Sequence, residues 1–309
     1  MLGGDAVKRW LLSLFAGACL VLCIASGGAL AQDNDPPKDH HVFLPMVFRP
    51  VQYSFFVAGH PRNNDNNTGL YPPFRARFSD INALNPDFGV FTGDMVIYGT
   101  PANWDAVDTD VALLNMPVYF VVGNHDMTNR DLFVSRYGPT YYSFEYGGDL
   151  FIVLDSELDN GSVTRDQFSF LSTVLQESHA RRVFLFVHRV IWVTEDSPYY
   201  SLRTEVNFWK AYDPHANFWN DVLPLLLDLN VPVYVIAGDV GVPWAMSLFC
   251  DEYENIHFVA SGMGGNEEEN FLTFHVLGDN VQIKAYRLDG HPLNLGTVEA
   301  YNLEYYTKP

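Results

Sequence analysis

Cysteine is scarce in this sequence. The chain of 309 residues has three, and Cys19 and Cys23 fall in an N-terminal stretch that we expect to be removed. Only Cys250 then remains, so no intramolecular disulfide can form. Stability must come from the core, and a hydrophobic content of 48% is ample for one. Cys250 lies in an apolar run and is expected to be a buried small hydrophobic residue.

Basic residues are also few. The sequence has 18 Lys and Arg against 37 Asp and Glu, a formal net charge of -19. An acidic surface repels nucleic acids and anionic membranes over long range, so we expect neither as a partner. It favours solubility and tolerates cationic partners or metal ions. The chain has no internal repeat, and the sequence leaves its oligomeric state undetermined.

Residues 1–31 have the organisation of a secretory signal peptide. Lys8 and Arg9 precede an apolar run at residues 10–24, and Ala29-Leu-Ala31 is typical of a cleavage site. The protein is therefore predicted to be secreted, to the periplasm or the extracellular space. An uncleaved N-terminal membrane anchor is the alternative. Residues 32–52 are predicted to be a linker, residues 53–290 the domain, and residues 291–309 a C-terminal tail.

Hydrophobic patterning predicts a layered α/β fold. Apolar runs at 55–58, 88–92 and 118–122 alternate with helical spacing at 72–84 and 102–114. A hairpin is predicted at 141–154, and further strands at 183–187, 231–237, 256–260, 271–276 and 281–286. Two more helices are predicted, one after a capping box at Thr164 and Gln167 and one at 218–229. The aromatic segment 192–217 is either a functional loop or a cover for the sheet edge.

Metal-capable side chains follow the predicted buried strands repeatedly. They are His60, Asp94, Asn124, His125, Asp126, His188 and Asp239. Ligand sites collect at the carboxyl ends of strands in such folds, although each residue alone is more typical of a turn. Carboxylate, amide and imidazole groups suit Mn, Fe or Zn, and a carboxylate such as Asp94 can bridge two ions. His125, paired with Asp126, is placed to act as an acid toward a leaving oxygen.

These motifs resemble those of the calcineurin-like metallophosphoesterase family. The resemblance rests on Gly-Asp-x4-Gly at 93–99, Gly-Asn-His-Asp at 123–126 and Val-His at 187–188. Residues 136–144 and 151–155 are similar to exported, purple-acid-phosphatase-like members. The resemblance covers roughly residues 53–288. It implies a four-layer α/β/β/α sandwich, with two mixed β-sheets flanked by helices and a metal site at the C-terminal ends of strands.

The first and last family motifs are altered. His60 stands where the family has Asp, and Arg62 where it has a ligand His. Asp239 replaces the first His of the last motif, and Gly241 leaves the second without a side chain. Ile97 stands where purple acid phosphatases have Tyr, so we expect no iron-tyrosinate site.

The resemblance then implies one complete metal position. Its ligands would be Asp94, Asn124, His188 and Asp239. A second position would have only Asp94 and His60, and Arg62 would direct a permanent cation at it. We expect one divalent ion, with the second uncertain, and we expect Arg62 to bind a phosphate oxygen instead.

Three functions are compatible with these residues. The first is an exported hydrolase of small phosphomonoesters or phosphodiesters. In it a metal-activated water attacks phosphorus, His125 protonates the leaving group, and Asp126 orients His125. The second is a non-catalytic phosphoesterase-like binding module with a degenerate metal site, as the changes at positions 60, 62 and 241 would suggest. The third is a metallohydrolase of non-phosphorus substrates, with the aromatic insert shaping its pocket.

Residues 267–269, all Glu, are predicted to form a solvated loop.

Overall fold

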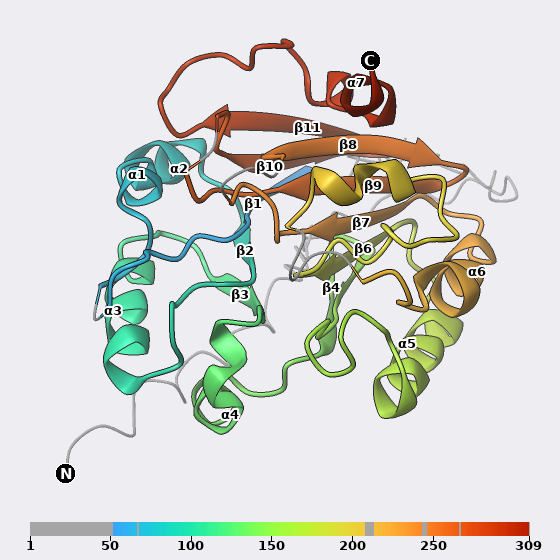
Figure 1. Ribbon diagram of the computed structural model, residues 1–309, viewed down its shortest axis with the longest axis horizontal. Helices are drawn as coiled ribbons and strands as arrows, with labels where there is room; N and C mark the ends of the chain where they lie inside the picture. The colour runs from blue at the N-terminus through green and yellow to red at the C-terminus, as the bar shows by residue number, and fades with distance from the viewer. Residues whose placement is uncertain (1–51, 67, 208–212, 243–245, 266, 309) are drawn as a thin grey trace, which may run out of the picture. The chain divides into compact units, whose positions relative to one another are not determined.

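Two mixed β-sheets form the framework of the protein (Figure 1). The structure is a computed structural model that describes residues 52–66, 68–207, 213–242, 246–265 and 267–308. The predicted signal peptide and all of the predicted linker except Gln52 lie outside the described residues. No helix in the described part of the chain has the length and apolar character needed to cross a membrane.

The first sheet has five strands in the order β11-β10-β1-β2-β3. Its strands are β1 (Gln52–Ala58), β2 (Phe88–Thr92), β3 (Val118–Val121), β10 (Asn270–Leu277) and β11 (Asn280–Arg287). β1, β2 and β3 are parallel to one another, and β10 and β11 continue the sheet antiparallel. The carboxyl ends of the three parallel strands therefore meet at one edge of this sheet.

The second sheet has six strands in the order β4-β5-β6-β7-β9-β8. They are β4 (Tyr142–Tyr146), β5 (Asp149–Val153), β6 (Val183–Val187), β7 (Val233–Ala237), β8 (Leu248–Tyr253) and β9 (Ile256–Ser261). The four central strands β5, β6, β7 and β9 are parallel, and all residues of β5, β6 and β7 are buried. β8 was not predicted from the sequence, and it contains Cys250, which is buried as expected.

Helices cover the outer faces of both sheets (Figure 1). Those beside the first sheet are α1 (Pro72–Arg75), α2 (Phe78–Leu84), α3 (Pro101–Val111) and α4 (Arg130–Tyr137). Those beside the second are α5 (Arg165–Glu177) and α6 (Leu223–Leu227), the latter preceded by a π-helix at Phe218–Val222. The helix predicted at 72–84 divides into α1 and α2. The predicted capping box is wrong, because Thr164 makes no side-chain cap and its hydroxyl donates to Asp159 instead.

Three apolar clusters separate the layers and confirm the α/β/β/α sandwich. One lies under α1–α4, one under α5 and α6, and one between the two sheets. The middle cluster is aromatic: the Phe55 ring stacks on Phe88 and Phe274 with centroids 5.1 and 4.7 Å apart. Phe151 and Phe184 of the second sheet meet Phe55 edge-on at 5.5 and 5.1 Å. Offset and edge-on aromatic pairs of this kind stabilise a core beyond their burial alone.

The aromatic insert 192–217 packs against the second sheet in the residues that the structure describes. Trp192, Tyr199, Leu202 and Val206 are buried in the outer cluster of that sheet. The side chain of Trp219 donates a hydrogen bond to the carbonyl of Trp192 at 2.7 Å. Trp192 and Tyr199 therefore cover the sheet, as one of the two interpretations predicted, whereas the aromatic residues at 208–212 lie outside the described residues.

The C-terminal segment is part of the same compact unit. Tyr301 is buried, and its carbonyl accepts a hydrogen bond from the backbone of Cys250 in β8 at 3.0 Å. The following helix α7 (Leu303–Thr307) lies beside β8, because the Tyr306 hydroxyl donates to the Leu248 carbonyl at 2.6 Å (Figure 1). Glu268 accepts a 2.5 Å hydrogen bond from the Tyr301 hydroxyl, and Glu269 accepts one from Gly264 at 2.8 Å. The prediction of a merely solvated loop at 267–269 is therefore wrong.

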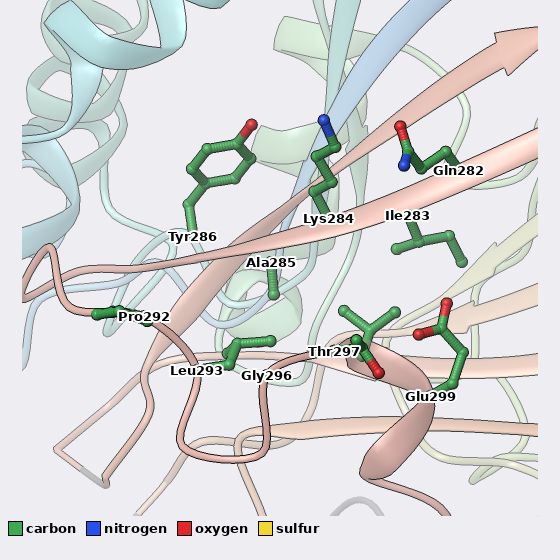
Figure 2. A pocket seen from close by; sticks show the side chains of 11 residues that line it. Gln282, Ile283, Lys284, Ala285, Tyr286, Pro292, Leu293, Gly296, Thr297 and Glu299 are labelled. Carbon is green, nitrogen blue, oxygen red and sulfur yellow. The ribbon is translucent and has the colours of Figure 1, made fainter.

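A groove of about 400 Å³ separates β11 from the C-terminal segment (Figure 2). Figure 2 shows Ile283 and Ala285 projecting toward the segment that carries Leu293 and Gly296, and Lys284 projecting away from it. None of the predicted site residues lines this groove. The candidate site lies elsewhere, at the strand ends.

Candidate active site

Asp94 lies at the centre of the candidate site. It follows β2 through Gly93, and both residues adopt positive φ angles, which turn the chain sharply at the end of the strand. Its carboxylate is buried, with one oxygen 3.5 Å from His188 Nε2 and the other 3.3 Å from His60 Nε2. His125 Nε2 lies 4.0 Å from the same carboxylate. The ends of β1, β2, β3 and β6 therefore converge on one side chain.

Asp239, at the end of β7, completes this group. Its Oδ2 lies 3.6 Å from His188 Nε2. Its backbone N–H donates to the carbonyl of His188 at 2.8 Å, as the neighbouring Gly238 does at 3.0 Å. These bonds place the ends of β6 and β7 side by side. The Asp239 carboxylate, which stands where the family motif has a histidine, therefore lies in the same site as Asp94 and His188.

Three buried atoms at this point have no hydrogen-bond partner. They are Asn124 Oδ1, His188 Nε2 and Asp239 Oδ2. His188 Nδ1 lies 2.9 Å from the carbonyl oxygen of Thr92, so Nδ1 carries a proton and Nε2 faces the site. Buried polar atoms left without partners are costly and call for an explanation. A cation accounts for them: either a proton on His188 Nε2, which faces both carboxylates, or a metal ion, to which each atom would present a lone pair.

The donor set fits a divalent ion chemically. Together with Asp94 it offers carboxylate, amide and imidazole donors, which suit Mn, Fe or Zn. Counting only His, Cys, Asp and Glu, the described residues contain no group of three or more that could hold a metal ion. The assignment therefore depends on the Asn124 amide as well as on the carboxylates and the imidazole.

Two glycines leave room for this arrangement. A Cβ on Gly123 would lie 2.2 Å from Asp94 Oδ1 and 2.9 Å from His188 Nε2. A Cβ on Gly93 would lie 2.2 Å from His188 Nδ1. Any other residue at position 123 would thus fill the space between the candidate ligands, which accounts for a glycine before Asn124.

The opposite side of Asp94 is occupied by cationic or protonatable groups. Arg62 Nε lies 3.7 Å from Asp94 Oδ2 and is itself buried without a hydrogen-bond partner. His60 adopts a positive φ of 52°, and its Nδ1 lies 2.9 Å from the carbonyl oxygen of Met263. At Gly241, where φ is +81°, a Cβ would lie 2.4 Å from backbone atoms of Gly262 and Met263. This backbone has no space for the side chain that the family motif would place there.

Asp126 does not orient the His125 ring, contrary to the prediction. Its Oδ2 accepts hydrogen bonds from the backbone N–H groups of Asp94 and Gly123, at 2.8 and 2.9 Å. Its Oδ1 accepts from Met95 and Val96, at 2.9 and 3.2 Å. The carboxylate therefore ties the loop after β2 to the loop after β3. A carboxylate with so many backbone donors has no free acceptor direction for an imidazole.

The His125 ring is oriented by a backbone carbonyl instead. His125 Nδ1 lies 2.9 Å from the carbonyl oxygen of Ile97, and the His125 backbone N–H donates to Asp94 Oδ1 at 3.0 Å. The side chain retains 29% of its exposure, so Nε2 is accessible from solvent. Tyr98, next to Ile97, is 51% exposed.

Electrostatics favour positive charge between the two carboxylates. Burial lowers the pKa of His188, but Asp94 and Asp239 outweigh this effect and raise it to about 9. Burial raises the pKa of Asp94, but the opposite effect of His188 and His60 is larger, and the pKa of Asp94 lies well below its usual value. Burial and the charge of Asp94 raise the pKa of Asp126, against the lowering effect of Gly123 and Val96 N–H groups. The site therefore stabilises a cation, whether a proton or a metal ion.

One residue in contact with the site was not predicted. Asn207, in the aromatic insert, donates from Nδ2 to Asp239 Oδ1 at 2.9 Å. No sequence motif marks it, because it lies in an irregular segment far along the chain from the strand-end residues. Of the predicted residues, those within 4.0 Å of the Asp94 carboxylate are His60, Arg62, His125 and His188, and Asp239 lies beside His188. Asn124 and Asp126 lie in the loop that carries His125.

Comparison with known proteins agrees with this architecture. The model of the family "Calcineurin-like phosphoesterase" matches residues 39–243. The chain is 29% identical over 146 residues to the serine/threonine-protein phosphatase CPPED1 of Pongo abelii, which is 39% of this chain and 46% of that protein. It is 29% identical over 123 residues to the probable glycerophosphodiester phosphodiesterase GpdQ of Arcobacter nitrofigilis, covering 35% of this chain and 44% of that protein.

A solved structure shares the fold. The crystal structure of a dimetal phosphatase from Danio rerio superimposes with a TM-score of 0.53 at 15% identity, over 77% of this chain and 97% of that one. The chain spans just under half the length of the two curated relatives. Since the family model matches well over half of the sequence, the chain belongs to the calcineurin-like phosphoesterase family.

Proposed function

We propose that this chain is an exported, metal-dependent hydrolase of small phosphoric esters. One observation carries the proposal: the residues that follow the strands around Asp94 include three buried polar atoms without hydrogen-bond partners, namely His188 Nε2, Asp239 Oδ2 and Asn124 Oδ1. The relatives, named as a phosphatase and a phosphodiesterase, support phosphoric esters as the substrate class. The N-terminal sequence pattern supports export.

Asp94, Asn124, His188 and Asp239 are the residues that would hold the ion. A divalent ion there acts as a Lewis acid toward a phosphoryl group and lowers the pKa of water to the physiological range. His188 presents Nε2 to the ion because Nδ1 is held by the Thr92 carbonyl. The second oxygen of Asp94 remains between His60 and Arg62, on the side away from His188.

His125 and Arg62 would act on the substrate. Protonated His125, held through Nδ1 by the Ile97 carbonyl, presents Nε2–H to the leaving oxygen as a general acid. The Arg62 guanidinium lies where a second ion would otherwise stand and donates to a phosphoryl oxygen. Its Nε has no partner in the described structure, so it has a donor to offer. Asp126 acts only by holding the two loops that carry Asp94 and His125.

One ion per chain follows from the altered side of the site. Arg62 is a permanent cation 3.7 Å from Asp94, and Gly241 supplies no ligand. Placing a second divalent ion beside the guanidinium would add like-charge repulsion in a buried environment.

The same alterations favour a second candidate, a binding module that has lost catalysis. That function requires no acid at position 125 and no metal at the strand ends. The two candidates are separated by assaying p-nitrophenyl phosphate and bis-p-nitrophenyl phosphate with added Mn, Zn, Fe, Co or Ni. The proposal predicts hydrolysis that depends on the added ion and is lost in Arg62→Ala. Absence of hydrolysis with every ion would refute catalysis and leave the binding module.

A further inference from the structure

We propose that Asn207 is a positioning residue that holds Asp239 in the orientation needed to bind the metal ion. Asn207 Nδ2 donates to Asp239 Oδ1 at 2.9 Å. The other oxygen, Oδ2, is left without a partner and faces His188 Nε2 at 3.6 Å. One oxygen is thus anchored and the other directed into the site. This inference rests on the metal site of the proposed function.

The hydrogen bond fixes a side chain that has little else to hold it. Asp239 is fully buried, and among the described residues Asn207 makes the hydrogen bond to its carboxylate, while His188 Nε2 attracts Oδ2 from 3.6 Å. A carboxylate turns readily about its Cβ–Cγ bond, so without Asn207 both oxygens would be available to the ion or to other groups. Anchoring Oδ1 leaves Oδ2 as the ligand and reduces the entropy lost on binding.

The segment that carries Asn207 is itself held against the second sheet. Leu202 and Val206 are buried in its outer cluster, and the Glu205 carbonyl accepts a 2.5 Å hydrogen bond from the backbone of Met246. The 3₁₀-helix Tyr200–Thr204 ends three residues before Asn207. Asn207 therefore reaches Asp239 from a packed part of the insert, and the insert is joined to the candidate metal site.

An amide suits this position for a physical reason. Where the family motif has a histidine, this chain has a carboxylate, and its second oxygen needs a donor when buried. A lysine or arginine at 207 would satisfy that oxygen but would compete with a metal ion for the charge. The neutral amide donates a hydrogen bond and leaves the full charge of Asp239 to the ion. Groups that support metal ligands in this way commonly change metal affinity by about 10- to 100-fold when removed.

The test compares the metal affinity of Asn207→Leu and Asn207→Gln with that of the unaltered chain. Leu has nearly the same shape and no donor, whereas Gln keeps the donor. Thr204→Ala is the matched control, because Thr204 lies exposed in the same segment and its hydroxyl bonds only to Glu205 among the contacts described. Affinity for Zn²⁺ or Mn²⁺ is measured by competition with a fluorescent chelator, and the melting temperature is measured in excess EDTA.

We expect Asn207→Leu to weaken metal binding about 10- to 100-fold. Asn207→Gln should recover part of the loss. The melting temperature in EDTA should be lower for Asn207→Leu than for Thr204→Ala, because Asp239 Oδ1 is left buried without a donor, so metal affinity is measured well below that temperature, where the variant is folded. If Asn207→Leu does not fold, Asn207→Ser, whose side chain is too short to reach, replaces it. If the unaltered chain binds metal and Asn207→Leu binds it with the same affinity, the role of Asn207 is refuted and the metal site stands. Absence of metal binding in the unaltered chain overturns the metal site, and with it this inference.

Discussion

Replacing Asp126 by asparagine should destabilise the fold rather than merely slow the reaction. The carboxylate is fully buried, and each of its oxygens accepts two backbone hydrogen bonds. Asparagine keeps one oxygen and substitutes an NH₂ group, itself a donor, for the other. Whichever way the amide turns, two buried backbone N–H groups lose their acceptor and face another donor.

The magnitude follows from those two groups. An unsatisfied buried donor costs about 1–3 kcal/mol, so Asp126→Asn should lower the free energy of unfolding by about 2–6 kcal/mol. This loss of unfolding free energy arises in the loops after β2 and β3, so it should be measured in the metal-free protein as well. A role in orienting His125 would instead predict a stable variant with reduced turnover.

The assay is equilibrium urea unfolding in EDTA, followed by far-ultraviolet circular dichroism. Asp80→Asn is the control, because Asp80 is half exposed and pairs only with Arg77 at 2.9 Å, an interaction worth at most about 1 kcal/mol. A loss of less than about 1 kcal/mol in Asp126→Asn, combined with a large loss of turnover, would refute the argument. It would restore the interpretation in which Asp126 and His125 act as a pair.

Two further substitutions test the acid and the altered side of the site. His125→Asn should lower kcat by about 10²- to 10⁴-fold while leaving metal affinity unchanged, and the loss should be larger for alkyl than for aryl phosphates, because a good leaving group needs less protonation. Equal losses for both substrates would contradict the acid role. Gly241→His should not create a second metal site, since its Cβ would lie 2.4 Å from the backbone of Gly262 at a φ of +81°. It should lower stability by about 1–3 kcal/mol in urea unfolding, and a stable variant that binds an additional ion would contradict this account.

The strands that form the site could be predicted from sequence because they are buried on both faces. β2, β5, β6 and β7 are continuous apolar runs, and a polar residue directly after such a run lies at a strand end. That rule located Asp94, His188 and Asp239, which the structure brings within 3.6 Å of one another through His188.

Side-chain direction could not be predicted in the same way. Adjacency of His125 and Asp126 suggested a pair, but neighbouring residues in a tight turn point in different directions, and Asp126 turns toward backbone N–H groups. The capping box at Thr164 failed for a similar reason, since the nearby Asp159 takes its hydroxyl. The short strand β8 combines apolar and acidic residues and lacks a clear period of two. Asn207 reaches Asp239 only through tertiary packing.

The number of metal ions per chain tests the central claim most directly. The purified chain is equilibrated with Mn²⁺ or Zn²⁺, freed of unbound ion by gel filtration, and analysed for metal and protein content. One ion per chain, lost in Asp239→Ala, is the predicted result, because we propose Asp94, Asn124, His188 and Asp239 as one ligand set and Arg62 as the replacement for a second ion. Two ions per chain, or none, would contradict it.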